Sequence, residues 1–431
     1  MQVFGAIFCG LAVFQLAILV LSSCQSALGK RRQNRLALEA LQEQVRAAKT
    51  ARIQQEQRQL CWNGVRKFEV ARKTEEARNI CSFELVPHDR KPLPRFLPGQ
   101  FLTFHLRPEG TERQVVRCYS ISSPPNPDYF RVTIKRVFPP DEMSSAPPGL
   151  ISNYFHDEIN VGDILDVEAP RGKFYIDPNL VRPRVFIAGG VGITPFISMI
   201  HALAESNVTT DTILFYGIHG REDEAFRDEL NGILNASDNL TVHVCFSQEN
   251  GVARSVEETS PAKIHHQKIT LDLLQRELGT SNYDFYLCGP PPMMDCLIAD
   301  LQSWGVPKSQ IFTEAFGPAT GKAVRKVQMS HQEDNGKDDN QQVVPASPYR
   351  VCFSKSDKQA VWDPAVTSLL ELARQLDVEV ESGCESGHCG TCVLAIKSGS
   401  TICTNEQGAE TEEGTCLACI SVPCENLVLD A

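Results

Sequence analysis

Three cysteines near the C-terminal end have a spacing that suits metal chemistry. Cys384, Cys389 and Cys392 follow a C-x4-C-x2-C pattern, and glycines lie between and around them. Three thiolates so spaced in a tight loop, with one distant thiolate, are the ligand set of a [2Fe-2S] cluster. The distant ligand would come from one of three cysteines that follow: Cys403, Cys416 or Cys419.

The segment around Cys419 is the best place for that fourth ligand. It is followed by Pro423 and an apolar run at 427–429 that is typical of a closing strand. Residues 349–431 resemble a plant-type ferredoxin domain, an α+β β-grasp fold, and this resemblance favours Cys419 over Cys416. Structural zinc also binds four thiolates, but it usually takes two C-x2-C pairs, and the loop has one.

Composition limits the classes of protein that the chain can belong to. Its 431 residues predict about two to four domains. A hydrophobic content of 42% and a charged content of 22% are ordinary for globular domains, and a net charge of −11 argues against nucleic acid as a partner. The sixteen cysteines are spread along the chain, which favours a reducing compartment, and the ten histidines show no metal-ligand spacing.

The N-terminal segment is predicted to be a membrane anchor. Residues 2–29 carry no charge, and residues 3–21 are apolar apart from Gln15, which is long enough for a bilayer-spanning helix. Lys30, Arg31 and Arg32 follow, so a single-pass protein with its remaining domains on the cytoplasmic side is expected. A cleaved signal peptide, or a lipoprotein signal ending at Cys24, is the competing interpretation.

The rest of the chain divides by composition. We predict a transmembrane anchor at 1–29, a helical stalk at 30–61, an antiparallel β-barrel flavin domain at 62–180, an α/β parallel-sheet nucleotide domain at 181–318, a polar linker at 319–348 and the ferredoxin domain at 349–431.

Two motifs of the predicted barrel suit a phosphorylated flat ring. In the strand-like run that contains Arg117, Tyr119 and Ser120, the cation suits a phosphate, the aromatic ring suits stacking and the hydroxyl suits a ring nitrogen. Residues 149–155 then look like a glycine turn that opens a short helix, whose unpaired amides suit a pyrophosphate. The candidate residues of this second motif are Gly149, Ile151 and Ser152.

A second nucleotide site is predicted where a buried strand at 185–188 leads into a glycine turn and a helix. Backbone amides at such a junction meet a diphosphate. Strand-like runs at 212–216, 241–246 and 284–288 alternate with helical segments, so a parallel sheet is expected. The candidate residues of the turn are Gly189, Gly190, Gly192, Thr194 and Pro195.

The order of these motifs resembles the ferredoxin-NADP reductase superfamily, in particular the FAD-binding reductases of oxygenases and of hybrid-cluster proteins that carry a fused C-terminal ferredoxin. The residues at 312–318 are also similar to the end of the reductase part of flavohaemoglobins. The resemblance implies that Arg117 holds a flavin phosphate and that Ser120 and Cys288 are the catalytic residues. It adds four cofactor contacts: Cys288, Gly289, Pro290 and Phe316.

Together these features predict a membrane-anchored NAD(P)H-dependent iron-sulfur flavoprotein. A hydride would pass to FAD, and single electrons would pass through the [2Fe-2S] cluster to an oxygenase, a desaturase or another membrane-associated redox partner. The turn with Arg221, Glu222 and Asp223 leaves the nucleotide open, and the resemblance favours NADH over NADPH. The alternatives are a membrane-tethered zinc-thiolate protein with a vestigial flavin fold, and a flavin-dependent ferric or quinone reductase.

Overall fold

The computed structural model describes residues 60–111, 114–125, 128–139, 148–206, 210–248, 261–316, 349–383, 385, 387, 390–403 and 411–431. From Cys61 to Ala431 the chain forms one compact unit. No helix within these described ranges is long and apolar enough to cross a bilayer. The predicted anchor, residues 30–59 of the stalk, the linker at 319–348, Cys384 and Cys389 lie outside them.

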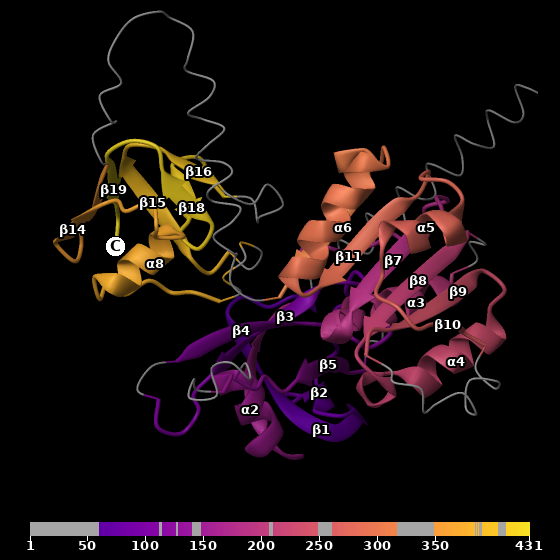
Figure 1. Ribbon diagram of the computed structural model, residues 1–431. Helices are drawn as coiled ribbons and strands as arrows, with labels where there is room; N and C mark the ends of the chain where they lie inside the picture. The colour runs from indigo at the N-terminus through magenta and orange to yellow at the C-terminus, as the bar shows by residue number, and fades with distance from the viewer. Residues whose placement is uncertain are drawn as a thin grey trace, which may run out of the picture. The chain divides into compact units, whose positions relative to one another are not determined.

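The first domain is an antiparallel six-stranded barrel (Figure 1). Its strands run in the order β4-β3-β6-β1-β2-β5. An antiparallel bridge between Ile121 and Val132 joins the two end strands, so the sheet closes on itself. The strands are β1 (Val65–Ala77), β2 (Ile80–Pro87), β3 (Phe101–Leu106), β4 (Val115–Ser120), β5 (Phe130–Lys135) and β6 (Ile164–Glu168), and the helix α2 (Leu150–Asp157) follows β5.

Aromatic side chains fill the barrel. Phe68, Phe83, Phe104 and Phe130 are fully buried because alternate residues of these strands point inward. The ring of Phe155 on α2 packs edge-on against Phe83, with ring centroids 5.2 Å apart, and closes one end of the core. The sequence prediction of a small β-barrel is confirmed.

The second domain is a parallel sheet in the order β10-β9-β8-β7-β11-β12. Its strands are β7 (Arg184–Gly189), β8 (Thr212–Ile218), β9 (Leu240–Phe246), β10 (Lys263–His265), β11 (Asp284–Gly289) and β12 (Ile311–Ala315). The α-helices are α3 (Thr194–Ala204), α4 (Arg227–Ala236), α5 (Leu271–Leu278) and α6 (Pro291–Ser303), and the short 3-10 helices are η2 (Gly190–Ile193), η3 (Arg221–Asp223) and η5 (Lys308–Gln310).

Separate apolar clusters cover the two faces of this sheet. One includes Phe196 of α3 and Leu230 of α4, and the other includes Leu273 of α5 and Leu301 of α6. Figure 1 shows α3 and α4 apart from α5 and α6, as in a doubly wound fold. The strand order reverses between β7 and β11, and such a switch point is where open α/β sheets bind ligands.

The third domain has a mixed sheet in the order β14-β13-β19-β15-β17, a β16-β18 pair and one helix. Its elements are β13 (Arg350–Phe353), β14 (Lys358–Val361), α8 (Leu369–Gln375), β15 (Val393–Ser398), β16 (Thr401–Cys403), β17 (Thr415–Leu417), β18 (Ser421–Pro423) and β19 (Leu427–Leu429). The Ser368 hydroxyl caps α8 by accepting from the Glu371 amide at 3.2 Å. The predicted α+β ferredoxin fold agrees with this arrangement.

Candidate functional site

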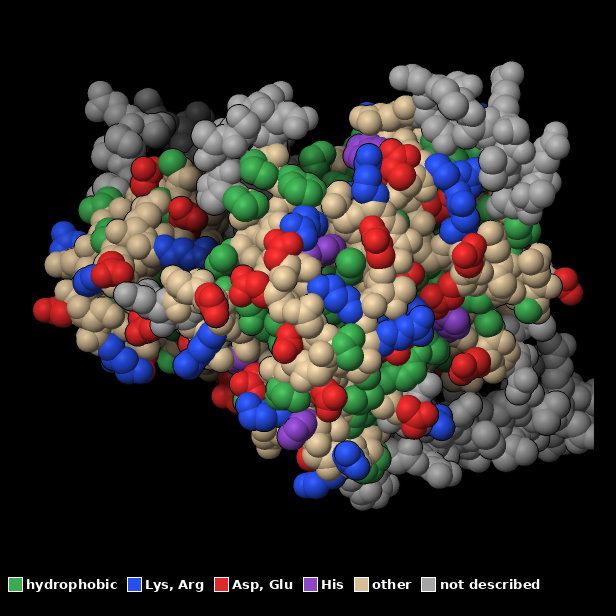
Figure 2. Space-filling model, turned by 90° about the horizontal axis from the view of Figure 1, so that it is seen from below, with side chains coloured by type: hydrophobic (Ala, Val, Ile, Leu, Met, Phe, Trp, Pro, Cys, Tyr) green, Lys and Arg blue, Asp and Glu red, His purple; other side chains and the backbone are tan. Residues whose placement is uncertain are grey.

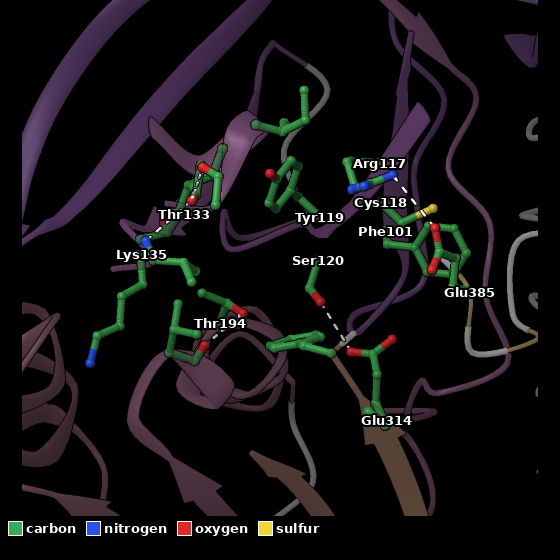
Figure 3. Close-up of a pocket in the computed structure, with 18 of the residues that line it drawn as sticks. Phe101, Arg117, Cys118, Tyr119, Ser120, Thr133, Lys135, Thr194, Glu314 and Glu385 are labelled. Carbon is green, nitrogen blue, oxygen red and sulfur yellow. Dashed lines mark hydrogen bonds and ion pairs between the residues drawn. The ribbon is translucent and has the colours of Figure 1, made fainter. Parts of the chain in front are cut away.

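A cavity of about 470 Å³ lies where the barrel meets the nucleotide domain and the cysteine loop (Figure 3). From the barrel it is lined by β4, β5 and the start of α2, and from the nucleotide domain by η2, the start of α3 and the end of β12. Predicted site residues in the lining are Arg117, Tyr119, Ser120, Gly149, Ile151, Ser152, Thr194 and Phe316. The fold therefore brings most of the predicted flavin residues together.

The β4 residues enter the cavity with a cation, a phenol and a hydroxyl. The Tyr119 ring is fixed by edge contacts with Phe104 and Phe155, at centroid distances of 5.7 and 5.4 Å. Burial raises the pKa of the Tyr119 hydroxyl above its usual range, so it stays protonated at physiological pH. The Arg117 guanidinium donates one hydrogen bond, to the Val116 carbonyl at 2.7 Å. A guanidinium has five N–H donors, so others can bind a phosphate.

The start of α2 presents backbone amides to the same cavity. The helix begins at Leu150, and amides of a first helical turn have no partner within the helix. The Ser152 hydroxyl donates to the Gly149 carbonyl at 3.0 Å and accepts from the Val137 amide at 3.1 Å. Ser152 therefore holds the helix start in place, so the backbone is the better candidate for a pyrophosphate contact.

The glycine turn of the nucleotide domain lies at the carboxyl end of β7. Gly190 has a φ of +55°, which favours glycine. A Cβ on Gly192 would lie 2.2 Å from the carbonyl oxygen of Cys288, so the turn packs directly on the end of β11. The Thr194 hydroxyl donates to the Val191 carbonyl at 3.0 Å, and Pro195 lies in the first turn of α3, where its missing N–H costs nothing.

The remaining predicted residues lie around this turn and outside the cavity lining. They are Gly189, Gly190, Gly192, Pro195, Cys288, Gly289 and Pro290. Cys288 is fully buried. Burial, and then the charge of Glu314, hold the pKa of its thiol well above the usual value. Cys288 is therefore a neutral thiol beneath the glycine turn, which suits packing and positioning.

Sequence reasoning missed Glu314 as a site residue. The Ser120 hydroxyl donates to Glu314 Oε2 at 3.0 Å, across 194 residues of sequence. Glu314 is only 4% exposed and lines the cavity at the end of β12. The available signal was a carboxylate near the end of β12, two residues before the predicted Phe316. The structure pairs Ser120 with this carboxylate, a contact that the sequence did not indicate.

The cysteine loop reaches the cavity through Gly383 and Glu385. Glu385 accepts from both terminal nitrogens of Arg374, at 2.6 and 3.3 Å, and lies 4.0 Å from Arg117 Nη1. A Cβ on Gly387 would meet Ile420 Cδ1 at 2.3 Å, so the loop packs tightly on the segment that contains Cys419. One arginine of the flavin cavity thus also faces the loop.

Two of the four predicted cluster ligands are among the described residues. Cys392 and Cys419 are both buried, and the Cys419 amide donates to Cys392 Sγ at 3.5 Å. Cys416 is also buried, so burial does not separate it from Cys419. Cys403 is exposed on β16. This geometry is compatible with Cys419 as the fourth ligand, which stays a prediction.

Three family models match the chain in consecutive order. They are an oxidoreductase FAD-binding domain at residues 67–176, an oxidoreductase NAD-binding domain at 186–298 and a 2Fe-2S iron-sulfur cluster binding domain at 353–424. The chain is an iron-sulfur flavoprotein oxidoreductase. Its cofactors are FAD, NAD(H) and a [2Fe-2S] cluster, so the third model decides against the zinc interpretation of the cysteine loop.

Relatives of this oxidoreductase match its flavin and nucleotide domains. A flavohemoprotein of Oceanobacillus iheyensis is 33% identical over 257 residues, which are 60% of the chain and 60% of that protein. The chain thus spans about three fifths of the length of the curated relatives that it matches. A solved structure also matches: the flavohem-like FAD/NAD-binding domain of a nitric oxide dioxygenase from Vibrio cholerae O1 biovar El Tor. It is 28% identical, with a TM-score of 0.50, and the match covers 59% of this chain and the whole of that domain.

One solved structure extends the likeness in fold to the ferredoxin domain. An intact type IV self-sufficient cytochrome P450 monooxygenase covers 85% of the oxidoreductase with a TM-score of 0.57 and 22% identity, and 41% of that protein is matched.

The residues of the oxidoreductase fit its cofactors. A cation, a buried phenol, hydroxyls and the amides of α2 surround the cavity, as a flavin with a pyrophosphate requires. The glycine turn at the switch point leaves a nucleotide close access to backbone. In the third domain the buried Cys392 and Cys419 are in contact, and the cysteine loop packs through Gly387 against Ile420, the neighbour of Cys419.

Proposed function

We propose that the oxidoreductase takes a hydride from NADH and delivers single electrons to a protein acceptor through its ferredoxin domain. The observation that carries this proposal is the one cavity lined by flavin-site residues, by the nucleotide turn and by Gly383 and Glu385 of the cysteine loop. When bound, FAD supplies the chemistry that converts a two-electron donor into single-electron steps. Because the flavin residues, the nucleotide turn and the cysteine loop border the same cavity, electrons would travel only a short distance between the cofactors.

The side chains of this cavity bind and orient the reactants. Arg117 and the first turn of α2 would hold the flavin phosphates, and the Tyr119 ring would stack on the flavin. Ser120, hydrogen-bonded to Glu314, would present a hydroxyl whose orientation is fixed. A hydroxyl and a carboxylate in contact can also hold or pass a proton between the cavity and Glu314.

The choice of NADH rests on the charges of the turn after β8. The Arg221 guanidinium is paired with Glu224 at 3.0 Å and lies 4.9 Å from the Phe246 ring centroid. Glu222 is exposed beside it, and a carboxylate favours a ribose with a free 2′-hydroxyl over a 2′-phosphate. The ratio of kcat/KM for NADH and NADPH tests this choice, and a ratio below one would refute it.

The membrane anchor and a membrane-associated acceptor are part of the proposal. Their support is the uncharged run at 2–29, which lies outside the described residues, and the resemblance to reductases that serve oxygenases and desaturases. On the face drawn in Figure 2, acidic and basic side chains are interspersed, so that face gives no charge preference for a partner. Equal activity toward a membrane acceptor after deletion of residues 1–60 would contradict the anchor.

Anaerobic titration of the full-length holoprotein with NADH tests the electron path. We expect flavin and iron-sulfur absorption to bleach together in the wild-type protein. In Cys392→Ser the flavin should still bleach, while reduction of an iron-sulfur chromophore and of a one-electron protein acceptor should be lost. Cys352→Ser, a half-buried cysteine of β13 that is not among the candidate ligands, is the matched control. Full electron delivery by Cys392→Ser would refute the path and favour a direct flavin-dependent ferric or quinone reductase.

A further inference from the structure

Two histidines and a glutamate converge at the edge of the nucleotide sheet, apart from the residues that line the flavin cavity. His243 Nδ1 lies 2.9 Å from His265 Nε2 and 3.9 Å from Glu277 Oε2. The three potential ligand atoms all lie within 4.8 Å of one another. His243 is 2% exposed, and the other two are half-buried.

The fold accounts for this convergence. In the parallel β9–β10 pair, His265 lies opposite Cys245, so it shares a face of the sheet with Cys245 and with His243 two residues earlier. The helix α5 covers that face with Leu273 and Leu274, and Glu277 follows them by one helical turn. The rings of His243 and His265 stack with an interplanar angle of 9° and a centroid distance of 5.1 Å.

We propose that His243, His265 and Glu277 bind a divalent transition-metal ion, with zinc as the expected metal. Two imidazoles and one carboxylate are a ligand set that zinc takes in proteins, and a fourth position remains for water. The site joins the edge strand β10 to β9 and α5. Its expected role is to clamp this three-residue strand to the nucleotide domain.

The distances agree with a tetrahedral zinc site. Bonds of about 2.0–2.1 Å to each donor place neighbouring ligand atoms about 3.3 Å apart. The distances of 2.9 and 3.9 Å lie on either side of that value. The third pair, His265 and Glu277, lies within 4.8 Å, so side-chain movements of up to about 1.5 Å would bring all three ligand atoms to this spacing.

The charge state of the ligands is also favourable. Metal binding requires neutral imidazoles. His243 is 2% exposed, and burial disfavours the charged form of its ring. Two cations compete with a metal ion for the Glu277 carboxylate: the Lys263 ammonium lies 3.5 Å from Oε2, and Arg276 Nε lies 3.5 Å from Oε1 and is itself 58% exposed. The Lys263 ammonium is the one that lies on the strand of the proposed ligand His265. Its side chain is 59% exposed and can turn away into water.

Equilibrium dialysis of the full-length holoprotein against Zn²⁺ at pH 7 tests the proposal, with the metal counted per chain and its ligands identified by zinc-edge X-ray absorption. We expect one high-affinity zinc with a shell of nitrogen and oxygen only. His265→Ala and Glu277→Gln should each weaken binding by about 100-fold. Lys263→Gln should tighten it, because the competing cation is gone. His266→Ala, which changes the exposed neighbouring histidine, is the matched control.

Three results would overturn the site. Unchanged zinc affinity in both His265→Ala and Glu277→Gln would show that the ion binds elsewhere. A sulfur shell at about 2.3 Å would assign the zinc to cysteines of the ferredoxin domain. If neither the wild-type protein nor Lys263→Gln bound zinc, only the hydrogen bond between the two histidines would remain. Both ligand variants change half-buried positions, and circular dichroism would verify that they fold.

Discussion

Loss of the Glu229 carboxylate should destabilise the junction between the flavin and nucleotide domains. Arg131 of β5 donates to both oxygens of Glu229 on α4, at 2.9 Å each, and His201 of α3 also hydrogen-bonds to it. The Arg131 guanidinium lies 4.9 Å from the Phe226 ring centroid. In Glu229→Gln a mostly buried cation would lose its counter-charge, which is the costly way to break such a pair.

The pKa of Glu229 gives the size of the effect. Burial alone would raise it, but hydrogen bonds from His201 and Arg131 and the Arg131 charge outweigh burial and lower it from 4.5 to about 2. At about 1.4 kcal/mol per pH unit, this difference contributes about 3 kcal/mol of stability at neutral pH. Because the pKa is lowered, the contribution is complete above pH 4.5 and declines as the pH falls toward 2.

Urea unfolding, followed by the fluorescence of released flavin, measures this contribution. The midpoint of the flavin-release transition is compared between variants, and its shift multiplied by the slope of that transition gives the stability deficit. We expect Glu229→Gln to lower the midpoint by about 1 M urea at pH 7, and the stability deficit to fall from about 3 to about 1 kcal/mol at pH 3. Asp228→Asn, at the exposed neighbouring position, should match the wild-type protein. A deficit below about 0.5 kcal/mol, or one that is the same at both pH values, would refute the reasoning.

Three further predictions concern the nucleotide turn and the cavity. Gly192→Ala places a methyl group 2.2 Å from a β11 carbonyl oxygen, so KM for NADH should rise by about tenfold or more, whereas Gly232→Ala, with open space around it, should leave KM unchanged. Ser120→Ala removes the hydroxyl that contacts Glu314, so single-turnover flavin reduction should slow by about 10- to 100-fold with unchanged FAD content; an unchanged rate would assign Ser120 a packing role. Arg117→Ala should weaken FAD binding by about tenfold in equilibrium dialysis, since a charge-assisted phosphate contact is lost; full retention of FAD would contradict its phosphate role.

The sequence was sufficient for the features that short-range patterns encode. The strand, glycine turn and helix around Gly192 follow one another directly in the chain, so backbone rules alone predict their order and packing. The barrel was predicted from short apolar runs, and α2 from the glycine turn at Gly149. In these places local propensity and tertiary structure agree.

Contacts between distant residues could not be predicted in this way. Ser120 and Glu314 meet across 194 residues, and nothing in either local motif indicates the other. His243, His265 and Glu277 lack the short spacing of a metal motif, so the histidines looked unrelated until the parallel register of β9 and β10 and the position of α5 brought them together. The spacing of residues in the sequence predicts contacts within one loop or helix, whereas these contacts depend on how the strands and helices are assembled.

Polar pairs of unequal strength connect the three domains. Arg131 with Glu229 and Ser120 with Glu314 are short, largely buried contacts between the barrel and the nucleotide domain. Arg117 reaches Glu385 of the cysteine loop at 4.0 Å, and its side chain is 41% exposed, so this contact contributes little. Of these three polar pairs, the one that reaches the ferredoxin domain is the longest and the most exposed. Since polar interfaces permit domain motion, this asymmetry suits a carrier that collects electrons at the cavity and then presents them to another protein.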